Sequence, residues 1–502
     1  MPRLWGQSSA FTVPDPSHGG LSAGRPCGLS RVPRPTTPFL DCLANENVVF
    51  ENAIAAGAPT YYAMPPILAS RHPLALGRDV LGIAPEENTL ASVLREAGFK
   101  TAAFSAANPY LSSRFGYDRG FDVFADFLEG SENLGPEPSH PKNFRSRANE
   151  FIANACHSVG FLGAAYDELY FQYCQRLASP RVGSLDTQRR FPSADLVVDQ
   201  AIRWVKQNSG QRFFLWLHLM DAHGPYFPKA EALEMIGAKE IAAAEAVYLN
   251  SYWNRGDLRL ERLRDKRDSV VSLYDAGIRW VDEQIRRLAE NLVKLNVWDR
   301  CAMALTADHG EEFLDHGGKY HLPKKLTEEL VHVPLLVRVP GSSVQSRVKL
   351  PFSLLDLAPT ALDIVGVPSP ADFRGRSVWG QLRNGKLQER PVVSECVLDC
   401  SNPFYPRDRL GPRILSVRLG QYKLVMNFAS GSTTLYDLDR DPEETSPLPL
   451  GAAEEVRRKL LQHARRHLVE SSQSRDFDRR LASQVREYRL ELSRSAAHVR
   501  ET

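Results

Sequence analysis

Side chains that suit catalysis gather in three segments of this 502-residue sequence. The most informative segment is 306–341, where an apolar run ends in Asp308 and His309, and Lys319 and His321 follow. In open α/β sheets, ligands bind beyond the carboxyl ends of the strands. A carboxylate beside an imidazole at such a point suits a divalent metal ion. The alternative is that Asp308 caps a helix over the following EEFL while the histidines are solvated.

The second segment is FFLWLHLMDAHGPY, residues 213–226, which is again an apolar run with polar groups at its end. His218 lies within the apolar run, a position that favours a histidine buried for packing. His223 follows the run, where an imidazole could contact an anionic oxygen or transfer a proton. For His223 the structural and the catalytic interpretation both stay open.

Thr60 marks the third segment, because it stands between the small-residue stretch AAGAP and the helix-like stretch MPPILAS. A hydroxyl at the beginning of a helix usually caps it. It can also be a nucleophile, activated by a metal ion and by the positive end of the helix. The segment alone does not choose between these interpretations.

The elements that must position these groups alternate along the chain. Apolar patterns predict helices over 89–98 and 267–295, and buried strands over 99–105, 213–220, 301–306 and 333–339. This alternation is typical of an α/β fold with a mostly parallel sheet flanked by helices. Short strands separated by turn residues within 391–440 predict a small antiparallel sheet.

Changes in composition divide the chain into regions. Residues 1–33 are rich in proline and glycine and show no strand pattern, whereas 34–385 carry the α/β pattern. Within that domain, 127–200 is polar and aromatic, and we expect a helical insertion there. Residues 386–450 are predicted to form the small β subdomain, and 451–502 a charged helical tail that is solvated or partly disordered.

The charge balance excludes several classes of partner. Lysine and arginine number 62 against 60 aspartates and glutamates, so neither nucleic acid nor an anionic membrane is an expected partner. No apolar run approaches the ~20 residues of a membrane span, and no signal-peptide pattern follows Arg3. We therefore expect a cytoplasmic protein. The seven cysteines are scattered and form no disulfide framework, and nothing indicates an oligomeric state.

Together, the three segments and the phrases around them resemble the sulfatase family of the alkaline phosphatase superfamily. The resemblance covers about residues 34–450 and rests on phrases such as RPTTPFLDCLANENVVFENAIAAG, FLWLHLMDAHGPYFP, TADHGEEFLDHG and LYDLDRDPEET. It implies an alkaline-phosphatase-like α/β fold. It also implies hydrolysis of a sulfate, phosphate or phosphonate ester carried by a small molecule or a glycan.

Three residues carry what the resemblance implies for the reaction. Asp308 and His309 match two ligands of the family's divalent metal, and Thr60 falls where the family places its nucleophile. We expect one divalent ion, Ca²⁺ first with Mn²⁺, Mg²⁺ or Zn²⁺ as alternatives, and Thr60 as a further ligand. The usual nucleophile of the family is a cysteine or serine oxidised to formylglycine. A threonine cannot become formylglycine, so the resemblance leaves a threonine alkoxide that attacks directly.

The resemblance places five further residues near the same pocket. His223 matches a histidine that contacts the transferred group, and His321 and Lys319 lie in a loop where the family has a further lysine or histidine. These three are expected to be catalytic. Asn108, which follows the TAAF strand, is expected to bind substrate, as is His218.

One departure from the family concerns its metal ligands. In sulfatases a first strand ending in an aspartate-rich phrase precedes the RPTTP segment, and here no aspartate lies between Ser17 and Pro38. We expect this strand to be missing from residues 1–33, which would leave the ion with too few oxygen ligands. A catalytically impaired protein or binding protein with the same fold is therefore the alternative to an active hydrolase. A phosphoryl or phosphoethanolamine transferase ranks third, since related transferases carry membrane spans.

Overall fold

The computed structural model describes the chain over residues 3–8, 34–77, 80–128, 168–169, 171–172, 183–239, 241–256, 258–342, 344 and 346–472. Of residues 3–8 only the backbone is described. Most of the predicted insertion, and residues 473–502 of the predicted tail, lie outside the described residues.

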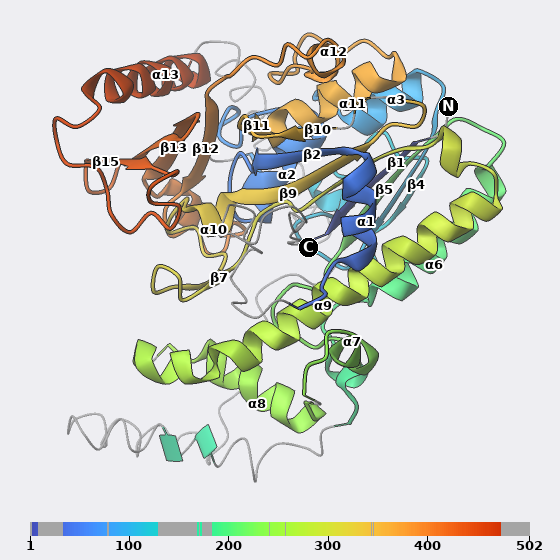
Figure 1. The fold of residues 1–502 in the computed structure, drawn as a ribbon, viewed down its shortest axis with the longest axis horizontal. Coiled ribbons are helices and arrows are strands. Elements are labelled where there is room, and N and C mark those ends of the chain that lie inside the picture. The colour runs from blue at the N-terminus through green and yellow to red at the C-terminus, as the bar shows by residue number, and fades with distance from the viewer. Residues whose placement is uncertain are drawn as a thin grey trace, which may run out of the picture.

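A nine-stranded sheet is the centre of the described structure (Figure 1). Its strands follow the order β10-β2-β9-β6-β1-β5-β3-β4, and β11 pairs with β2. The strands are β1 (Arg3–Ser8), β2 (Val48–Ile54), β3 (Lys100–Ser105), β4 (Val123–Ala125), β5 (Phe213–Leu219), β6 (Ala302–Thr306), β9 (His332–Arg338), β10 (Ser346–Val348) and β11 (Phe352–Ser353). Only β9 runs antiparallel to its neighbours, β2 and β6. The predicted α/β class with a mostly parallel sheet is confirmed.

The expectation that residues 1–33 contribute no strand is wrong. β1 lies in the middle of the sheet and pairs in parallel with both β5 and β6. Its sequence, RLWGQS, is short, contains glycine and lacks the long apolar run by which a central strand is usually recognised. Neighbouring strands on both sides supply its hydrogen-bond partners, so the ladder can form without strong local propensity. The strand contains no carboxylate.

Helices cover both faces of the sheet. Alternate side chains of β5 point to opposite faces and contribute to two separate apolar cores. Phe213, Leu215 and Leu217 face one core, and Phe214 and Trp216 face the other. The first core is covered by α1 (Pro38–Glu46), α6 (Ala194–Asn208), α7 (Ala230–Met235), α8 (Ala243–Asn254) and α9 (Leu260–Lys294), and the second by α2 (Thr60–Ala69), α3 (Leu90–Glu96) and α11 (Leu357–Val365). Within the described ranges, no helix is both long and apolar enough to span a bilayer.

Two predicted boundaries change with these helices. α6 packs against β5 and β3, so residues 194–200 belong to the covering layer of the sheet and not to the predicted insertion. The helix predicted over 267–295 begins earlier, at Leu260. The first part of α9 is rich in charged residues, so it shows no apolar periodicity that would predict a helix.

The predicted small antiparallel sheet is confirmed in the carboxyl-terminal part of the chain. It consists of β12 (Val392–Val397), β13 (Arg413–Leu419), β14 (Tyr422–Asn427) and β15 (Ser432–Asp437), in that order. α13 (Glu454–Ser472) packs on β13 and β14 and buries Leu460 and Ala464 (Figure 1). This part of the predicted tail is therefore docked and not solvated.

A buried ion-pair cluster joins the small sheet to the main domain. Lys423 on β14 has a fully buried ammonium, which lies 2.9 Å from a carboxylate oxygen of Glu328 and 2.9 Å from one of Glu444. Glu328 begins α10 (Glu328–Val331), directly before β9, and also pairs with Arg418 at 2.7 Å. Its backbone N–H donates to Glu444 at 2.6 Å. The charges balance only when both parts of the chain are in place.

Replacing Lys423 with methionine should lower the free energy of unfolding by about 3–5 kcal/mol, because Glu444 would stay buried without its cation. Lys459→Met is the matched control, since Lys459 is exposed and, within the described part of the chain, pairs only with Glu455 on α13. It should change stability by less than about 0.5 kcal/mol. Guanidinium unfolding followed by tryptophan fluorescence measures both. Equal stability of the two variants would show that the buried cluster does not hold the two parts together.

Candidate active site

The predicted site residues lie at the carboxyl edge of the main sheet. His218 is near the end of β5, Asp308 and His309 follow β6, and Asn108 follows β3. β1 runs between β5 and β6, so the ends of these parallel strands meet at one edge. All four side chains are buried. The sheet thus brings together groups that are up to two hundred residues apart in sequence.

Thr60 reaches the same edge at the beginning of α2. Pro59 is the N-cap residue, and the Thr60 hydroxyl caps no backbone group of the helix. Instead, Thr60 Oγ1 lies 3.2 Å from His309 Nε2, and both residues are buried. The positive end of the α2 dipole therefore faces this hydroxyl and favours negative charge on it.

β12 of the small sheet holds the loop that precedes Thr60. Gly57 approaches β12 so closely that a Cβ there would lie 2.6 Å from the carbonyl oxygen of Glu395. The backbone N–H of Glu395 donates to the carbonyl of Ala56 at 3.0 Å. The Tyr61 hydroxyl donates to a carbonyl in the turn after β12. The small residues of the AAGAP stretch are thus explained by close backbone packing.

Asp308 is a buried acid whose neighbours are imidazoles. Burial pushes its pKa up, but His309 and His218 outweigh that effect, so the pKa of Asp308 lies below its usual value. Asp308 Oδ2 lies 3.6 Å from His309 Nε2 and has no hydrogen-bond partner. The alternative that Asp308 caps a helix fails, because the residues after it form the short strand β7 (Glu312–Phe313).

Two histidine-glycine pairs orient their imidazoles in the same way. His309 Nδ1 lies 2.8 Å from the Gly310 carbonyl oxygen, and His223 Nδ1 lies 2.6 Å from that of Gly224. A carbonyl oxygen only accepts, so Nδ1 of each ring carries the hydrogen. Burial lowers the pKa of both histidines, that of His223 to about 3, so the rings are neutral at pH 7. Each ring therefore presents an unprotonated Nε2, suited to bind a metal ion or accept a proton.

His321 completes the imidazole cluster, and a glutamate missed by the sequence analysis holds it. The His321 ring centre lies 4.4 Å from that of His309 and 4.9 Å from that of His223. Its Nδ1 lies 3.1 Å from Glu311 Oε1. Burial raises the pKa of Glu311 to about 7. The sequence shows Glu311 as an acid directly after Asp-His-Gly. Only the fold shows that its carboxylate contacts His321.

Asn108 and His218 form the inner wall of the site. Asn108 Nδ2 lies 3.4 Å from His218 Nε2, while His218 Nδ1 is buried and has no hydrogen-bond partner. Burial lowers the pKa of His218 to about 4, so this ring is also neutral. The packing interpretation of His218 explains its apolar surroundings but not the unpartnered nitrogen.

Lys319 is the predicted site residue that the structure directs elsewhere. It lies on β8 (Lys319–Tyr320), which pairs with β7. Its ammonium donates to the carbonyls of Trp253 and Arg255 at 2.7 and 2.6 Å, at the carboxyl end of α8. Cations are favoured at this end of a helix. The structure therefore supports an anchoring role for Lys319.

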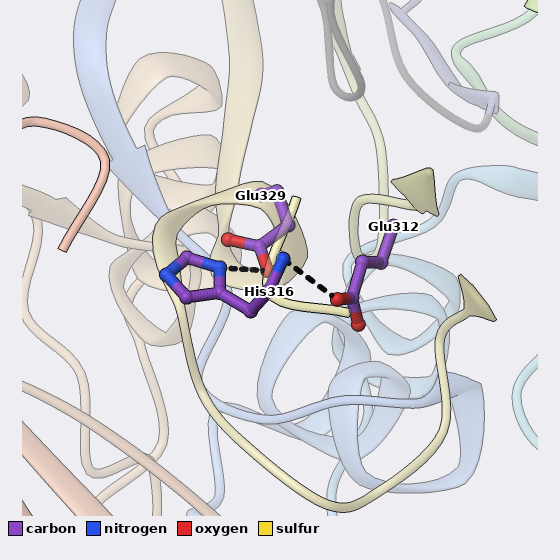
Figure 2. Close-up of side chains that lie close together, drawn as sticks. All are labelled: Glu312, His316 and Glu329. Atoms are coloured by element: carbon purple, nitrogen blue, oxygen red, sulfur yellow. Dashed lines mark hydrogen bonds and ion pairs between the residues drawn. The ribbon is translucent and has the colours of Figure 1, made fainter. Parts of the chain in front are cut away.

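A second group of ligand-type side chains lies beside the site. Glu312, His316 and Glu329 place their oxygen and nitrogen atoms within 4.8 Å of one another (Figure 2). His316 Nδ1 lies 2.8 Å from Glu329 Oε1, and the His316 backbone N–H donates to Glu312 at 3.0 Å. The ammonium of Lys325 lies 2.7 Å from the same Glu312 oxygen. Lys325 and His316 thus supply the positive charge that balances the two glutamates. These contacts fix the loop between β7 and α10.

Comparison with known proteins identifies the family. A sequence profile described as Sulfatase matches residues 22–367, and one described as N-sulphoglucosamine sulphohydrolase, C-terminal, matches residues 318–472. The first match covers more than half of the chain, so this protein belongs to the sulfatase family. The multifunctional alkaline phosphatase superfamily protein PehA of Trinickia caryophylli is 24% identical over 83% of this chain and 86% of that protein. Mouse arylsulfatase K is 27% identical over 49% of this chain, and the match spans about half of its own length (48%).

Solved structures show the same fold. One is a complex of a protein with its substrate D-glucosamine-2-N,6-O-disulfate, with a TM-score of 0.64 and 18% identity over 94% of this chain and 98% of that chain. Another is the phosphonate monoester hydrolase of Agrobacterium radiobacter, with a TM-score of 0.60 and 18% identity over 94% of this chain and 95% of that chain. The predicted alkaline-phosphatase-like fold and the resemblance to sulfatases are confirmed, and the chain is a hydrolase of this family.

The His316–Glu329 pair should make stability depend on pH. The hydrogen bond to Glu329 raises the pKa of His316 from 6.5 to about 9. A raised histidine pKa stabilises the folded state fully below pH 6.5, and this contribution is lost as the pH rises through 9. His316→Gln should therefore destabilise the protein by about 2 kcal/mol at pH 6 and by much less at pH 10. Urea unfolding at both pH values measures the difference.

His463→Gln provides the control for that measurement. Burial lowers the pKa of His463, so its titration affects stability only below pH 6.5. This variant should keep the wild-type change between pH 6.5 and 9. A His316→Gln variant that also keeps that change would contradict the role given to the ion pair.

Proposed function

We propose that this chain hydrolyses a sulfate ester, or a phosphate or phosphonate ester, with Thr60 as the nucleophile. The observation that carries the proposal is the 3.2 Å contact between Thr60 Oγ1 and His309 Nε2 at the beginning of the buried helix α2. The unprotonated nitrogen and the positive helix end favour an alkoxide at this point, whereas the negative charge of Asp308 opposes it unless a cation is bound between them. No comparable hydroxyl lies among the other predicted site residues.

The groups of the chain can complete the reaction in two steps. Thr60 Oγ attacks the sulfur or phosphorus atom, the bond to the leaving oxygen breaks, and a threonine sulfate or phosphate ester forms. The neutral His321 ring takes the hydroxyl proton at Nε2 and returns it to the leaving oxygen, while Glu311 stabilises the imidazolium. In the second step the same ring takes a proton from water, whose oxygen attacks the sulfur or phosphorus atom. The bond between that atom and Thr60 Oγ1 breaks, and the ring returns the proton to Oγ1.

Three atoms of the site fit a divalent ion. Asp308 Oδ2 lacks a hydrogen-bond partner and lies 3.6 Å from His309 Nε2, and Thr60 Oγ1 is the third donor. A divalent ion held there would lower the pKa of the hydroxyl and offset the charge of the transferred group. Ca²⁺ follows from the resemblance to the family, but it prefers about six to eight oxygen ligands. The imidazole nitrogen favours Zn²⁺, whereas the carboxylate also suits Mg²⁺ and Mn²⁺, so titration with all four expected ions distinguishes them.

The substrate class is supported by the relatives. The proteins that match carry names or bound substrates that involve sulfated glucosamine or a phosphonate monoester. An anionic ester of a small molecule or glycan therefore remains the proposed substrate. The alternative, an impaired enzyme or binding protein, is favoured by one observation: β1 contains no carboxylate where the resemblance leads us to expect metal ligands.

Thr60→Ala should reduce the hydrolysis of an aryl sulfate and of an aryl phosphonate monoester by roughly 10⁴-fold or more, because the nucleophile is lost. Thr60→Ser should retain part of the activity. Thr187→Ala, at an exposed threonine in the short 3-10 helix (Leu185–Gln188) before α6, is the matched control and should behave like the wild type. Steady-state rates with each ester test these expectations. Activity that survives in Thr60→Ala would remove Thr60 as the nucleophile.

Asp308→Asn should weaken the binding of the preferred divalent ion by at least about a hundredfold, and chelator treatment should abolish hydrolysis by the wild type. Asp268→Asn, at an exposed position on α9, is the control and should leave the affinity unchanged. Calorimetric titration with Ca²⁺, Mn²⁺, Mg²⁺ and Zn²⁺ measures the binding. If the wild type binds none of them and hydrolyses neither ester, the alternative of an impaired enzyme holds.

A further inference from the structure

A cavity of about 110 Å³ lies between the main domain and the small sheet, away from the proposed active site. Its walls come from β11, the segment that leads into α12 (Trp379–Arg383), and the beginning of β12. β11 and β12 are in contact across this boundary, and they lie near each other in Figure 1. The cavity meets α2 only through His72, just beyond the end of the helix opposite Thr60.

The lining of the cavity combines apolar and cationic side chains. Phe352 and Val393 contribute to the apolar part, and both are buried. Two arginines, Arg374 and Arg390, also line the cavity. Arg390 Nη1 has no hydrogen-bond partner.

The charges of this lining do not balance. Arg390 Nη1 lies 3.4 Å from Asp356 Oδ2, which neutralises one guanidinium. Among the described residues, Arg374 forms no ion pair, and its side chain is exposed. Burial lowers the pKa of His72 to about 3, so this ring is neutral and its unpartnered Nδ1 adds no charge. One positive charge is therefore left over.

We propose that this cavity binds a small organic monoanion, a carboxylate with a short apolar body. A guanidinium binds a carboxylate through two parallel hydrogen bonds, and one excess positive charge matches one carboxylate. The apolar side chains suit a short hydrocarbon part, smaller than a benzene ring, because a cavity known to hold benzene has about 150 Å³ and this one has about 110 Å³. The site is independent of the hydrolytic reaction and goes beyond the proposed function.

Titration of the full chain with sodium isobutyrate in a calorimeter tests the proposal. Isobutyrate should bind with one site per chain, and the neutral isostere isobutyramide should bind at least about tenfold more weakly. Arg374→Gln should weaken isobutyrate binding by about tenfold or more. Arg383→Gln, at an exposed arginine on α12 outside the cavity, is the matched control and should bind like the wild type.

Two further variants separate this site from the active site. Val393→Leu fills the cavity without changing its charge and should also weaken binding, whereas Thr60→Ala should leave isobutyrate binding intact. Failure of Thr60→Ala to hydrolyse esters would thus not affect this test. The proposal is overturned if the wild type does not bind isobutyrate at millimolar concentration, or if Arg374→Gln binds it as well as Arg383→Gln does. Competitive inhibition of hydrolysis that is insensitive to Arg374→Gln would also overturn it, because it places isobutyrate at Thr60.

Discussion

The burial of the Asp308 carboxylate is the constraint on which the site depends. It lies at the carboxyl edge of the sheet, and no lysine or arginine of the described residues pairs with it. A buried carboxylate without an opposite charge is costly. The imidazoles around Asp308 are neutral at pH 7 and do not balance its charge, so the proposed divalent ion would be the compensating group. Backbone carbonyls and Glu311 orient the rings of His309, His223 and His321.

The small carboxyl-terminal sheet fixes the loops on either side of α2 by hydrogen bonds from β12. Glu395 on β12 contacts the loop before Thr60 through its backbone, while its carboxylate accepts the N–H of Leu74 beyond α2. On α13, His467 Nε2 lies 3.1 Å from the same carboxylate. Together with the Lys423 cluster, these contacts tie both ends of α2 and the beginning of β9 to one sheet. The position of Thr60 therefore depends on residues more than three hundred positions away.

The site residues at the strand ends were predictable, because they are recognised from the residues directly around them. An apolar run such as that of β5 or β6 must be buried, and a polar group directly after it must lie at the edge of the sheet. Thr60 needed the resemblance to sulfatases as well, because its own segment is equally compatible with a capping role. β1 was missed, since a short strand held by two neighbours needs little propensity of its own.

The sequence by itself determined the fold class, the two sheets and which strand ends carry Asp308, His218 and His309. These follow from the order of apolar and polar residues along the chain, which is a local property. Only the tertiary structure decided the partners of side chains on loops. It placed Glu311 behind His321 and sent the ammonium of Lys319 to the end of α8. Such choices depend on which distant backbone and charged groups arrive at the same place, and spacing along a sequence does not contain that information.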